Sequence, residues 1–414
     1  MSQTDNEPPG VRATLPATGA MIEPLELSIV LPCLNEAETL AACIQKARLG
    51  LERAGVSGEV VVADNGSSDG SVAIAKEAGA RVVVVKAKGY GSALRGGIEA
   101  AWGKWIIMGD ADDSYDFSRI EGFVEKFRAG YVLVMGCRLP SGGGTIVPGA
   151  MPWKNRWIGN PILSFIGRLF FKSPTRDFHC GLRGLTREGY KKMELKTSGM
   201  EFASEMVIKA TLRALRIAEV PVTLHRDGRS RPPHLKPWRD GWRHLRFMLI
   251  YSPRWLFLMP GLVLAILGLG CGAVLAVSPL RVGGVAFDAG TLAVACLCVI
   301  IGGQLVAFAF FTKVFAIGEG LLPQDAKFSK VFQHFSLEEG IILGVLVLLL
   351  GLGLLGHALW VWREADFGML PFGDNLRRLI PAVTLVTLGI QIVFSSFFLS
   401  ILGLRTASRQ PPAT

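Results

Sequence analysis

The stretch Trp105-Ile-Ile-Met-Gly-Asp110-Ala-Asp112-Asp113 is an apolar run that ends in three carboxylates within four positions. The apolar part has the length and composition of a buried strand. Carboxylates at the exit of a buried strand are costly to keep charged unless they meet a cation or hydrogen-bond donors. Oxygen ligands at this spacing suit Mg²⁺ or Mn²⁺, although an isolated Asp-x-Asp is more often a solvated acidic turn. The surrounding sequence decides between these two interpretations.

Similar short runs, rich in β-branched residues, alternate with helical patterns on both sides of this stretch. They are Leu27–Leu31, Glu59–Asp64, Arg81–Val85 and Tyr131–Met135. Continuous apolar strands separated by helices predict an α/β domain whose mostly parallel sheet is covered on both faces. Ligands of such sheets bind beyond the carboxyl ends of the strands.

Polar and glycine-rich segments follow three of these strands directly. They are Pro32-Cys-Leu-Asn35-Glu36, Asp64-Asn-Gly-Ser-Ser-Asp69-Gly70 and Lys88-Gly-Tyr-Gly91. Taken alone, the second is more typical of a helix-capping turn than of a ligand-binding loop. The third is typical of a plain glycine loop or of a backbone that approaches phosphate. Because carboxyl ends of parallel strands share one edge, we expect these segments and the acidic cluster to converge on one pocket.

The C-terminal part of the chain is too apolar for an ordinary soluble protein. Half of the 414 residues are hydrophobic, although the net charge is +10. Four apolar runs each approach the roughly 20 residues that a membrane-spanning helix needs. They are Trp255–Val277, Gly290–Phe311, Gly340–Val361 and Leu379–Leu402. We therefore predict a transmembrane domain of four helical spans after the α/β domain.

The distribution of basic residues predicts the orientation in the membrane. Eight of them precede the first apolar run: Arg226, Arg229, Arg231, Lys236, Arg239, Arg243, Arg246 and Arg254. Such an excess marks the cytoplasmic side, so we expect a multi-pass plasma-membrane protein with a cytosolic N-terminal domain. The loop Arg363–Arg378 weakens this prediction, because it would place three arginines outside. Seven cysteines without C-x-x-C spacing favour free thiols in a reducing compartment.

The sequence divides into five parts: a polar, disordered tail (1–25), the cytosolic α/β domain (26–234), an interfacial amphipathic helix (235–254), the four spans (255–404) and a cytosolic tail (405–414). The interfacial helix is expected because Trp238, Trp242, Leu245 and Leu249 share one helical face beside Arg239, Arg243 and Arg246. The apolar stretch Ile162–Phe171 is a second candidate for contact with the bilayer.

In their order and spacing, the motifs P-x-x-N-E, D-N-G-S-x-D-G, K-G-x-G and D-A-D resemble family-2 glycosyltransferases of the GT-A fold. The likeness is greatest to polyprenyl-phosphate sugar synthases. It implies inverting, metal-dependent transfer of one hexose from a UDP- or GDP-linked sugar to undecaprenyl or dolichyl phosphate. Two alternatives remain: a processive polysaccharide synthase, and a catalytically silent membrane scaffold for lipid-linked sugar transport. Tyr251-Ser-Pro-Arg254-Trp255 matches the processive motif Q-x-x-R-W only in part, which favours single transfer.

The resemblance also implies roles for individual residues. The nucleotide sugar would be bound by Pro32, Cys33, Glu36, Val62, Asp64, Lys88, Asp110, Ala111, Asp112, Arg138, Arg226 and Arg231. Asp112, Asp113 and Arg138 would act on the leaving diphosphate, with Mg²⁺ or Mn²⁺ on Asp112. Relatives carry Gln two positions after the second Asp, where this chain has Ser114. The second metal ligand is therefore Asp113 or Ser114, and charge favours Asp113.

Two further motifs match the family imperfectly. Asp177-Phe-His-Cys-Gly181-Leu-Arg183 has Cys180 where relatives have a hydroxyl residue. His225-Arg226-Asp-Gly228-Arg229-Ser230-Arg231 matches R-x-x-G-x-S-[KR] except at its first basic position. The polyprenyl phosphate would be bound by Asp177, Arg183, Arg239 and Arg243. The expected partners are thus the nucleotide-sugar donor, this acceptor and the bilayer. No nucleic acid is expected as a partner, and the sequence leaves open whether the protein forms a homo-oligomer.

Overall fold

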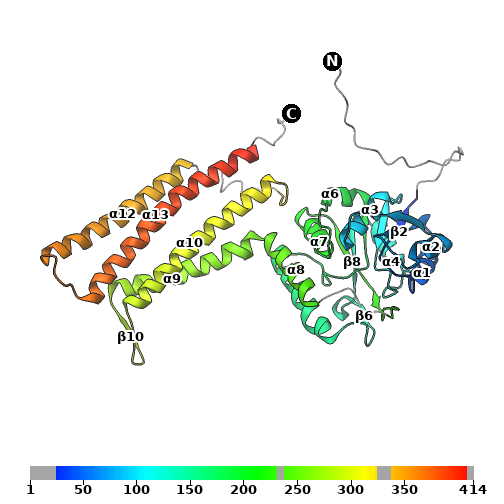
Figure 1. The fold of residues 1–414 in the computed structure, drawn as a ribbon, viewed down its shortest axis with the longest axis horizontal. Coiled ribbons are helices and arrows are strands. Elements are labelled where there is room, and N and C mark those ends of the chain that lie inside the picture. Colours follow the sequence, from blue (N-terminus) through cyan, green and yellow to red (C-terminus); the bar gives the residue numbers. More distant parts are fainter. Residues whose placement is uncertain (1–24, 231–236, 324–336, 408–414) are drawn as a thin grey trace, which may run out of the picture.

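The computed structural model describes residues 25–230, 237–323 and 337–407. An α/β domain is followed by four long helices that extend away from it (Figure 1). The predicted order of an α/β domain and a helical membrane domain is confirmed.

The α/β domain is built on a seven-stranded sheet in the order β3-β2-β1-β4-β7-β5-β8. Its strands are β1 (Leu27–Cys33), β2 (Gly58–Asp64), β3 (Arg81–Val84), β4 (Trp105–Met108), β5 (Leu133–Cys137), β7 (Arg183–Thr186) and β8 (Ile217–Pro221). Neighbouring strands run parallel except at β7, which is antiparallel to both β4 and β5. The mostly parallel sheet is therefore confirmed, with one antiparallel strand inserted beside the acidic cluster.

Alternating side chains of the strands feed two hydrophobic cores, one on each face of the sheet. On β1, Ile29 and Leu31 belong to one core and Val30 to the other. The first core is covered by α1 (Leu40–Arg53) and α4 (Glu121–Arg128), and the second by α3 (Tyr90–Ala100) and α7 (Phe202–Leu212). Two shorter helices, α2 (Ser71–Glu77) and α6 (Arg187–Met193), complete the layers. All seven cysteines are free thiols.

A second, two-stranded sheet lies beside the carboxyl edge of the main sheet. It pairs β6 (Thr145–Ile146) with β9 (Thr223–Leu224), and Leu224 also bridges to Tyr115 in the loop after β4. Between β6 and β7 the chain forms a π-helical turn, Asn155–Gly159, and α5 (Asn160–Phe171). After β9 it continues towards α8 (Pro237–Ile250), which contacts both α5 and α7.

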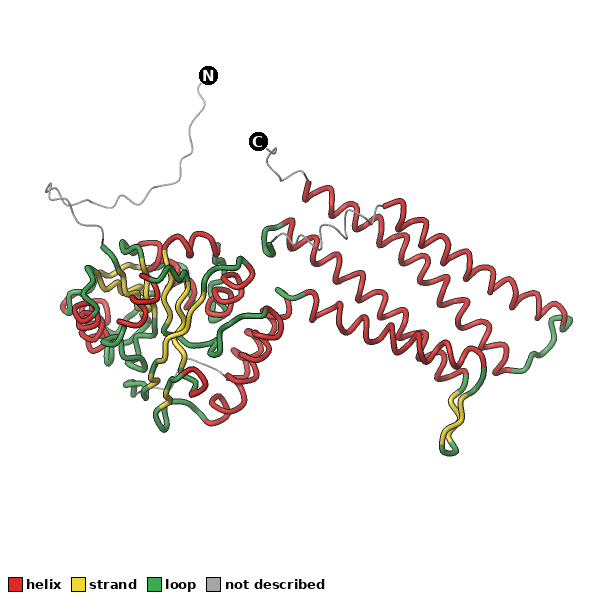
Figure 2. The backbone as a smooth tube through the Cα atoms, turned by 180° about the vertical axis from the view of Figure 1, so that it is seen from behind, coloured by secondary structure: helices red, strands yellow, loops and turns green. Residues whose placement is uncertain are grey.

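Four helices of the C-terminal part are long and apolar enough to cross a membrane: Arg254–Val277, Ala289–Gly318, Leu337–Glu364 and Gly373–Gly403. The first combines a π-helical turn (Arg254–Leu258) with α9 (Met259–Val277), and the others are α10 (Ala289–Gly318), α12 (Leu337–Glu364) and α13 (Phe372–Ala407). A hairpin of β10 (Leu280–Val282) and β11 (Val285–Phe287) joins the first two (Figure 2). The four predicted spans are confirmed as helices.

An ion-pair cluster lies at the end of the helices that faces away from the α/β domain. Arg377 of α13 contacts Asp288, which precedes α10, at 2.5 Å and Asp374 at 2.8 Å. Its side chain is only 13% exposed. One arginine of the loop that weakened the orientation prediction is therefore neutralised by two carboxylates.

Candidate active site

The loops that follow β1 and β2 are joined by hydrogen bonds between their polar side chains and backbones. The Asn35 backbone N–H donates to Ser67 Oγ at 2.9 Å, and the Ser68 N–H donates to Asn35 Oδ1 at 2.8 Å. The Ala37 N–H donates to Asp69 Oδ2 at 3.0 Å. The structure thus brings these two loops together, as the sequence predicted, and Asn35 and Asp69 are the residues that hold them.

Asp64 organises the loop after β2. Its carboxylate accepts hydrogen bonds from the backbone N–H groups of Gly66 at 3.0 Å and Ser67 at 3.1 Å, and the residue is buried. The turn interpretation of this motif is therefore correct, and binding of a nucleoside by Asp64 stays a prediction. Val62 is fully buried within the sheet, so its side chain serves the core.

The Lys88-Gly-Tyr-Gly91 segment packs against the protein itself. Lys88 Nζ donates to the carbonyl oxygen of Asn65 at 2.7 Å. Gly89 has a φ of 121°, and a Cβ there would collide with the carbonyl oxygen of Ser198. This glycine is required by the close approach of the protein's own backbone, which supports the plain glycine-loop interpretation.

The acidic cluster lies at the carboxyl end of β4. Asp110 accepts a hydrogen bond from the Tyr90 hydroxyl at 2.9 Å. Burial, helped by the neighbouring Asp112 carboxylate, raises the pKa of Asp110 to about 6. Asp112 accepts hydrogen bonds through Oδ1 from the Ser114 hydroxyl at 2.6 Å and backbone N–H at 3.1 Å. The carboxylate of Asp112 and the hydroxyl group of Ser114 therefore meet at one point, and Ala111, between Asp110 and Asp112 in the sequence, is buried.

Asp113 is directed away from this point. Its backbone has a φ of 62°, in the left-handed region, and its carboxylate accepts a hydrogen bond from Lys46 Nζ of α1 at 2.7 Å. Of the two candidates for a second metal ligand, the structure thus brings Ser114 to Asp112 and pairs Asp113 with Lys46. Metal ligation by Asp113 stays a prediction, and it would require that ion pair to open.

Arg229 is the functional candidate that sequence reasoning did not select. Its guanidinium contacts Asp112 Oδ2 through Nη2 and donates from Nη1 to Glu36 Oε1 at 3.1 Å. It thereby joins the loops after β1 and β4. Arg229 occupies a variable position of the R-x-x-G-x-S-[KR] motif, so the resemblance did not indicate it. Only its place in a run of basic residues close to the predicted site could have drawn attention to it.

Arg138 and Asp177 bind each other. Arg138 donates from Nε and Nη2 to the two oxygens of Asp177 at 2.7 and 2.8 Å, and its backbone N–H adds a bond of 3.0 Å. Both side chains are buried. Burial favours the protonated acid, but the guanidinium outweighs it and lowers the pKa of Asp177. These two residues, predicted to bind donor and acceptor respectively, form a single structural ion pair, and their ligand contacts stay predictions.

The other basic residues predicted to bind substrates lie in different places. Arg226 donates from Nε to the carbonyl oxygen of Pro148 at 2.8 Å, and Arg183 is fully buried with the carbonyl groups of Cys180 and Ala203 as acceptors. Arg239 is exposed on α8, where Arg243 lies 3.9 Å from Asp240. Arg231 lies outside the described residues.

Comparison with known proteins places this arrangement in a family. Residues 28–193 match the profile described as glycosyl transferase family 2, and residues 310–403 match that of the glycosyltransferase family 2 C-terminal transmembrane region. The low-salt glycan biosynthesis hexosyltransferase Agl6 of Haloferax volcanii is 38% identical over 380 residues, which is 91% of this chain and 89% of that protein. The chain belongs to glycosyltransferase family 2. The predictions of an enzyme of the hexosyltransferase class, of the GT-A type of domain and of a membrane domain are thereby confirmed.

Two weaker likenesses concern the catalytic domain of this family-2 glycosyltransferase. A dolichyl-phosphate hexose transferase of Haloferax volcanii is 27% identical over 197 residues, 48% of this chain and 82% of that protein. A crystal structure of glucosyl-3-phosphoglycerate synthase from Mycobacterium tuberculosis in complex with Mn²⁺, UDP and glucosyl-3-phosphoglycerate is 21% identical, with a TM-score of 0.42, covering 55% of this chain and 78% of that one. A structural likeness of this size is too low to indicate an activity.

In the catalytic domain of the glycosyltransferase, two histidines meet across a serine of α7. Ser204 Oγ lies 2.8 Å from His244 Nδ1 and 3.4 Å from His179 Nε2, and the imidazole rings are 4.7 Å apart. Burial lowers the pKa of His244 to about 4 and that of His179 well below its ordinary value. The pair is therefore neutral at physiological pH, and it joins the loop before β7 to α7 and α8.

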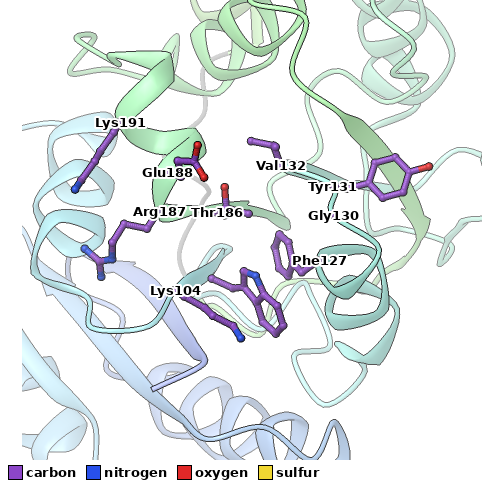
Figure 3. A pocket seen from close by; sticks show the side chains of 10 residues that line it. Lys104, Phe127, Gly130, Tyr131, Val132, Thr186, Arg187, Glu188 and Lys191 are labelled. Carbon is purple, nitrogen blue, oxygen red and sulfur yellow. The ribbon is translucent and has the colours of Figure 1, made fainter. Parts of the chain in front are cut away.

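Two cavities lie at opposite edges of the main sheet. The one at the carboxyl edge measures 250 Å³ and is lined by Asn35, Glu36, Ala37, Glu38, Ser68, Asp69 and Arg229. A larger hollow of 530 Å³ lies at the amino edge and is lined by Trp105 and by Phe127, Lys104 and Arg187, the last three of which are labelled in Figure 3. Those two aromatic rings stack on each other at 5.4 Å and are almost fully buried. Because Arg229, which contacts Asp112 of the acidic cluster, and its second partner Glu36 line the smaller cavity, we assign the candidate active site of the glycosyltransferase there.

Proposed function

We propose that this glycosyltransferase transfers a single hexose from a UDP- or GDP-linked sugar to a polyprenyl phosphate, undecaprenyl or dolichyl phosphate, with inversion at the anomeric carbon. The observation that carries the proposal is that Arg229 binds both Glu36 and Asp112. Arg229 belongs to the segment after β9, and α8 and the first span follow it in the chain. The name of the hexosyltransferase Agl6 supports transfer of a hexose, and that of the dolichyl-phosphate hexose transferase supports a lipid-phosphate acceptor.

The carboxylates fit a divalent metal of the magnesium type. Asp112 Oδ2 already binds a cationic group, the guanidinium of Arg229, so this oxygen is placed to accept positive charge. Within the described residues, no three His, Cys, Asp or Glu side chains form a metal cage. Mg²⁺ and Mn²⁺ commonly use one or two protein carboxylates together with substrate phosphates. We therefore assign Asp112 as the metal ligand, with Asp113 or Ser114 as the second, and Asp110 beside them.

The chemistry asks little of the protein beyond positioning and charge. A bound divalent metal would supply positive charge to the leaving nucleoside diphosphate. A lipid monophosphate is already largely ionised near neutral pH, so its oxygen needs no general base. Asp110, whose carboxylate accepts from Tyr90, and Glu36, whose backbone N–H donates to Ser71 at the start of α2, border the place where the donor would lie. The Arg138–Asp177 pair keeps the neighbouring backbone of β5 and the loop before β7 in place.

The acceptor would approach from the membrane side, between α5 and α8. Trp238 and Trp242 of α8 and Ile162, Phe165 and Leu169 of α5 are exposed large apolar side chains. The end of α5 is attached to the start of the first span, because Phe170 stacks on Trp255 at 5.4 Å. Exposed aromatic and aliphatic side chains next to basic residues are typical of a helix lying in the membrane interface. Arg239 and Arg243 would then lie near the lipid phosphates.

We infer a plasma-membrane location in which the α/β domain faces the cytosol. Basic residues are concentrated before the first span, and the helical end that carries the Asp288–Arg377 pair would lie outside. Labelling of a single cysteine introduced at Asp366 with a membrane-impermeant reagent tests this topology. Protection of that position in intact cells would contradict it.

The function is tested with the purified full chain, a short polyprenyl phosphate and a panel of labelled UDP- and GDP-sugars in the presence of Mg²⁺ or Mn²⁺. We expect one sugar per lipid, linked through an acid-labile glycosyl phosphate, from one member of the panel. Chelation with EDTA should abolish the product. A ladder of longer glycans would instead identify a processive synthase, and a total lack of transfer with every donor would favour the scaffold alternative.

A further inference from the structure

The segment after β9, residues 225–230, is attached to the acidic loop after β4 by main-chain hydrogen bonds. The His225 N–H donates to the carbonyl oxygen of Ser114 at 2.9 Å, and the Gly228 N–H donates to that of Asp112, also at 2.9 Å. Beyond them, Ser230 donates to Glu38 from its N–H at 2.7 Å and from its hydroxyl at 2.5 Å. The backbone on both sides of Arg229 is therefore attached to the two loops that carry the site's carboxylates.

Arg229 itself neutralises two of those carboxylates. It binds Glu36 through Nη1 and Asp112 through Nη2, while its Nε lies 3.6 Å from Asp227. Its side chain is only 12% exposed, so these charges interact in a partly desolvated place, where they are less screened than at a surface. Asp112 Oδ2, the oxygen assigned to the metal, is the one that the guanidinium contacts.

We propose that Arg229 is an internal counter-ion of the active site that the divalent metal must displace from Asp112, so that metal binding is an exchange of one cation for another. This inference rests on the proposed metal-dependent function. A guanidinium and a divalent metal ion next to the same carboxylate oxygen repel each other, so metal binding at Asp112 favours withdrawal of Arg229. The affinity of the site for metal alone is therefore lowered by the cost of displacing Arg229.

The structure provides a place for the displaced side chain. Arg229 borders the 250 Å³ cavity, whose other lining residues include Asp69 and Ser68. Asp227, which neighbours Arg229 along the segment, is a second partner that does not belong to the metal carboxylates. The guanidinium can thus leave Asp112 without entering an apolar environment, which keeps the exchange energetically accessible.

The exchange is tested by direct metal binding, without nucleotide and without any measurement of activity. Mn²⁺ is titrated into the purified full chain, and free Mn²⁺ is measured by electron paramagnetic resonance. Arg229→Gln removes the charge but retains hydrogen-bonding capacity, and we expect it to bind Mn²⁺ about tenfold more tightly than the wild type. Arg119→Gln makes the same change of net charge at a side chain that is 82% exposed and should leave the affinity unchanged. Arg229→Lys, which keeps the charge, should stay closer to the wild type.

Unchanged or weaker Mn²⁺ binding by Arg229→Gln would overturn the inference, and so would an equal gain in Arg119→Gln, which would indicate a general charge effect. A different result would contradict the proposed function. If Asp112→Asn bound Mn²⁺ with the same affinity as the wild type in the presence of UDP, Asp112 would not be a metal ligand. A readout on the unmodified chain covers the case in which Arg229→Gln does not fold. Mn²⁺ should accelerate tryptic cleavage after Arg229 at least threefold in the wild type and not in Asp112→Asn. Slower or unaltered cleavage would overturn the exchange.

Discussion

Two arginines of this glycosyltransferase bind carboxylates in opposite ways. Arg138 directs its guanidinium to one carboxylate, Asp177, in a bidentate geometry that the backbone N–H of Arg138 reinforces. Arg229 divides its guanidinium between Glu36 and Asp112, which belong to two different loops, and it borders a cavity. The first arrangement is complete without a ligand, whereas the second leaves room for another cation to compete.

The comparison shows why burial and charge alone do not identify a catalytic residue. Both arginine side chains are nearly buried, at 8% and 12% exposure. The difference lies in how many partners share the charge and in which elements those partners belong to. A bidentate pair between adjacent segments stabilises the fold, while a cation shared between the loops of two strands can be exchanged when a ligand enters.

The largest effect expected from this comparison is the loss of stability in Asp177→Asn. The substitution leaves the Arg138 guanidinium buried without its counter-ion, which typically costs about 3–5 kcal/mol. Thermal unfolding of the purified full chain, followed by tryptophan fluorescence, measures the loss. Asp227→Asn is the matched control, because Asp227 is 40% exposed and its ion pair with Arg229 is long, at 3.6 Å. This substitution should cost less than about 1 kcal/mol of stability. Similar small losses in both variants would mean that Arg138 is available to bind the donor.

The next effect concerns activity without stability. Asp112→Asn removes the anionic ligand assigned to the metal and should lower transfer about 100-fold or more, with little change in the unfolding temperature. Asp113→Asn decides the second ligand: a comparable loss of transfer would confirm Asp113, and a small one would leave Ser114. Asp116→Asn serves as control, because the Asp116 carboxylate is bound within its own loop by Ser118 and by the exposed Arg119. Full activity of Asp112→Asn would contradict the site assignment.

The sequence predicted the fold better than the site, and the reasons are physical. Strand ends and spans follow from local runs of β-branched and apolar residues, so β1, β2, β4 and the four long helices lie where they were expected. Strand β7 was not expected, because Arg183-Gly-Leu-Thr186 is short and begins with an arginine that only the tertiary structure buries. Its antiparallel insertion between β4 and β5 depends on long-range pairing that no local pattern reports.

The partners of side chains were harder to predict than their positions. Asp113 and Lys46 are distant in sequence, and Asp113, whose backbone is left-handed, directs its carboxylate to Lys46. The pairing of Arg138 with Asp177 was likewise invisible, although each residue alone was recognised. Arg229 occupies a variable position of the family motif, so the motif assigns it no role, although the basic residues around it are equally informative.

Acidification should weaken the contact between the catalytic domain and α8. Burial lowers the pKa of His244 to about 4; Asp240 and Glu201 oppose this, and Arg183 and Arg243 add to it. Between pH 6.5 and 4 the unfolded chain binds more protons at this residue, so stability should fall with falling pH by about 1 kcal/mol per unit.

Thermal unfolding at pH 7 and pH 5 checks the sign, and His244→Gln, which retains a partner for Ser204, should show a smaller difference than the wild type. His179, whose ring faces His244, contributes in the same direction. Asp110 contributes in the opposite direction: its pKa is raised to about 6, so its stabilising term is present below its ordinary pKa and is lost as the pH rises through 6. An equal pH dependence in His244→Gln and the wild type would remove His244 as the cause.

The smallest expected effect concerns the exposed arginines of α8. Unlike Arg138 and Arg229, they should affect binding of the lipid acceptor alone. Arg239→Gln should raise the KM for polyprenyl phosphate about fivefold, because one basic residue near an anionic membrane contributes about 1 kcal/mol. The KM for the donor should not change, and the effect should shrink at high salt, since charges at the interface are screened. Arg128→Gln is the control, being exposed on α4, which lies on the side of the domain away from the four helices (Figure 1). Equal increases of both KM values would instead indicate that Arg239 contributes to binding of the donor diphosphate, near Arg229.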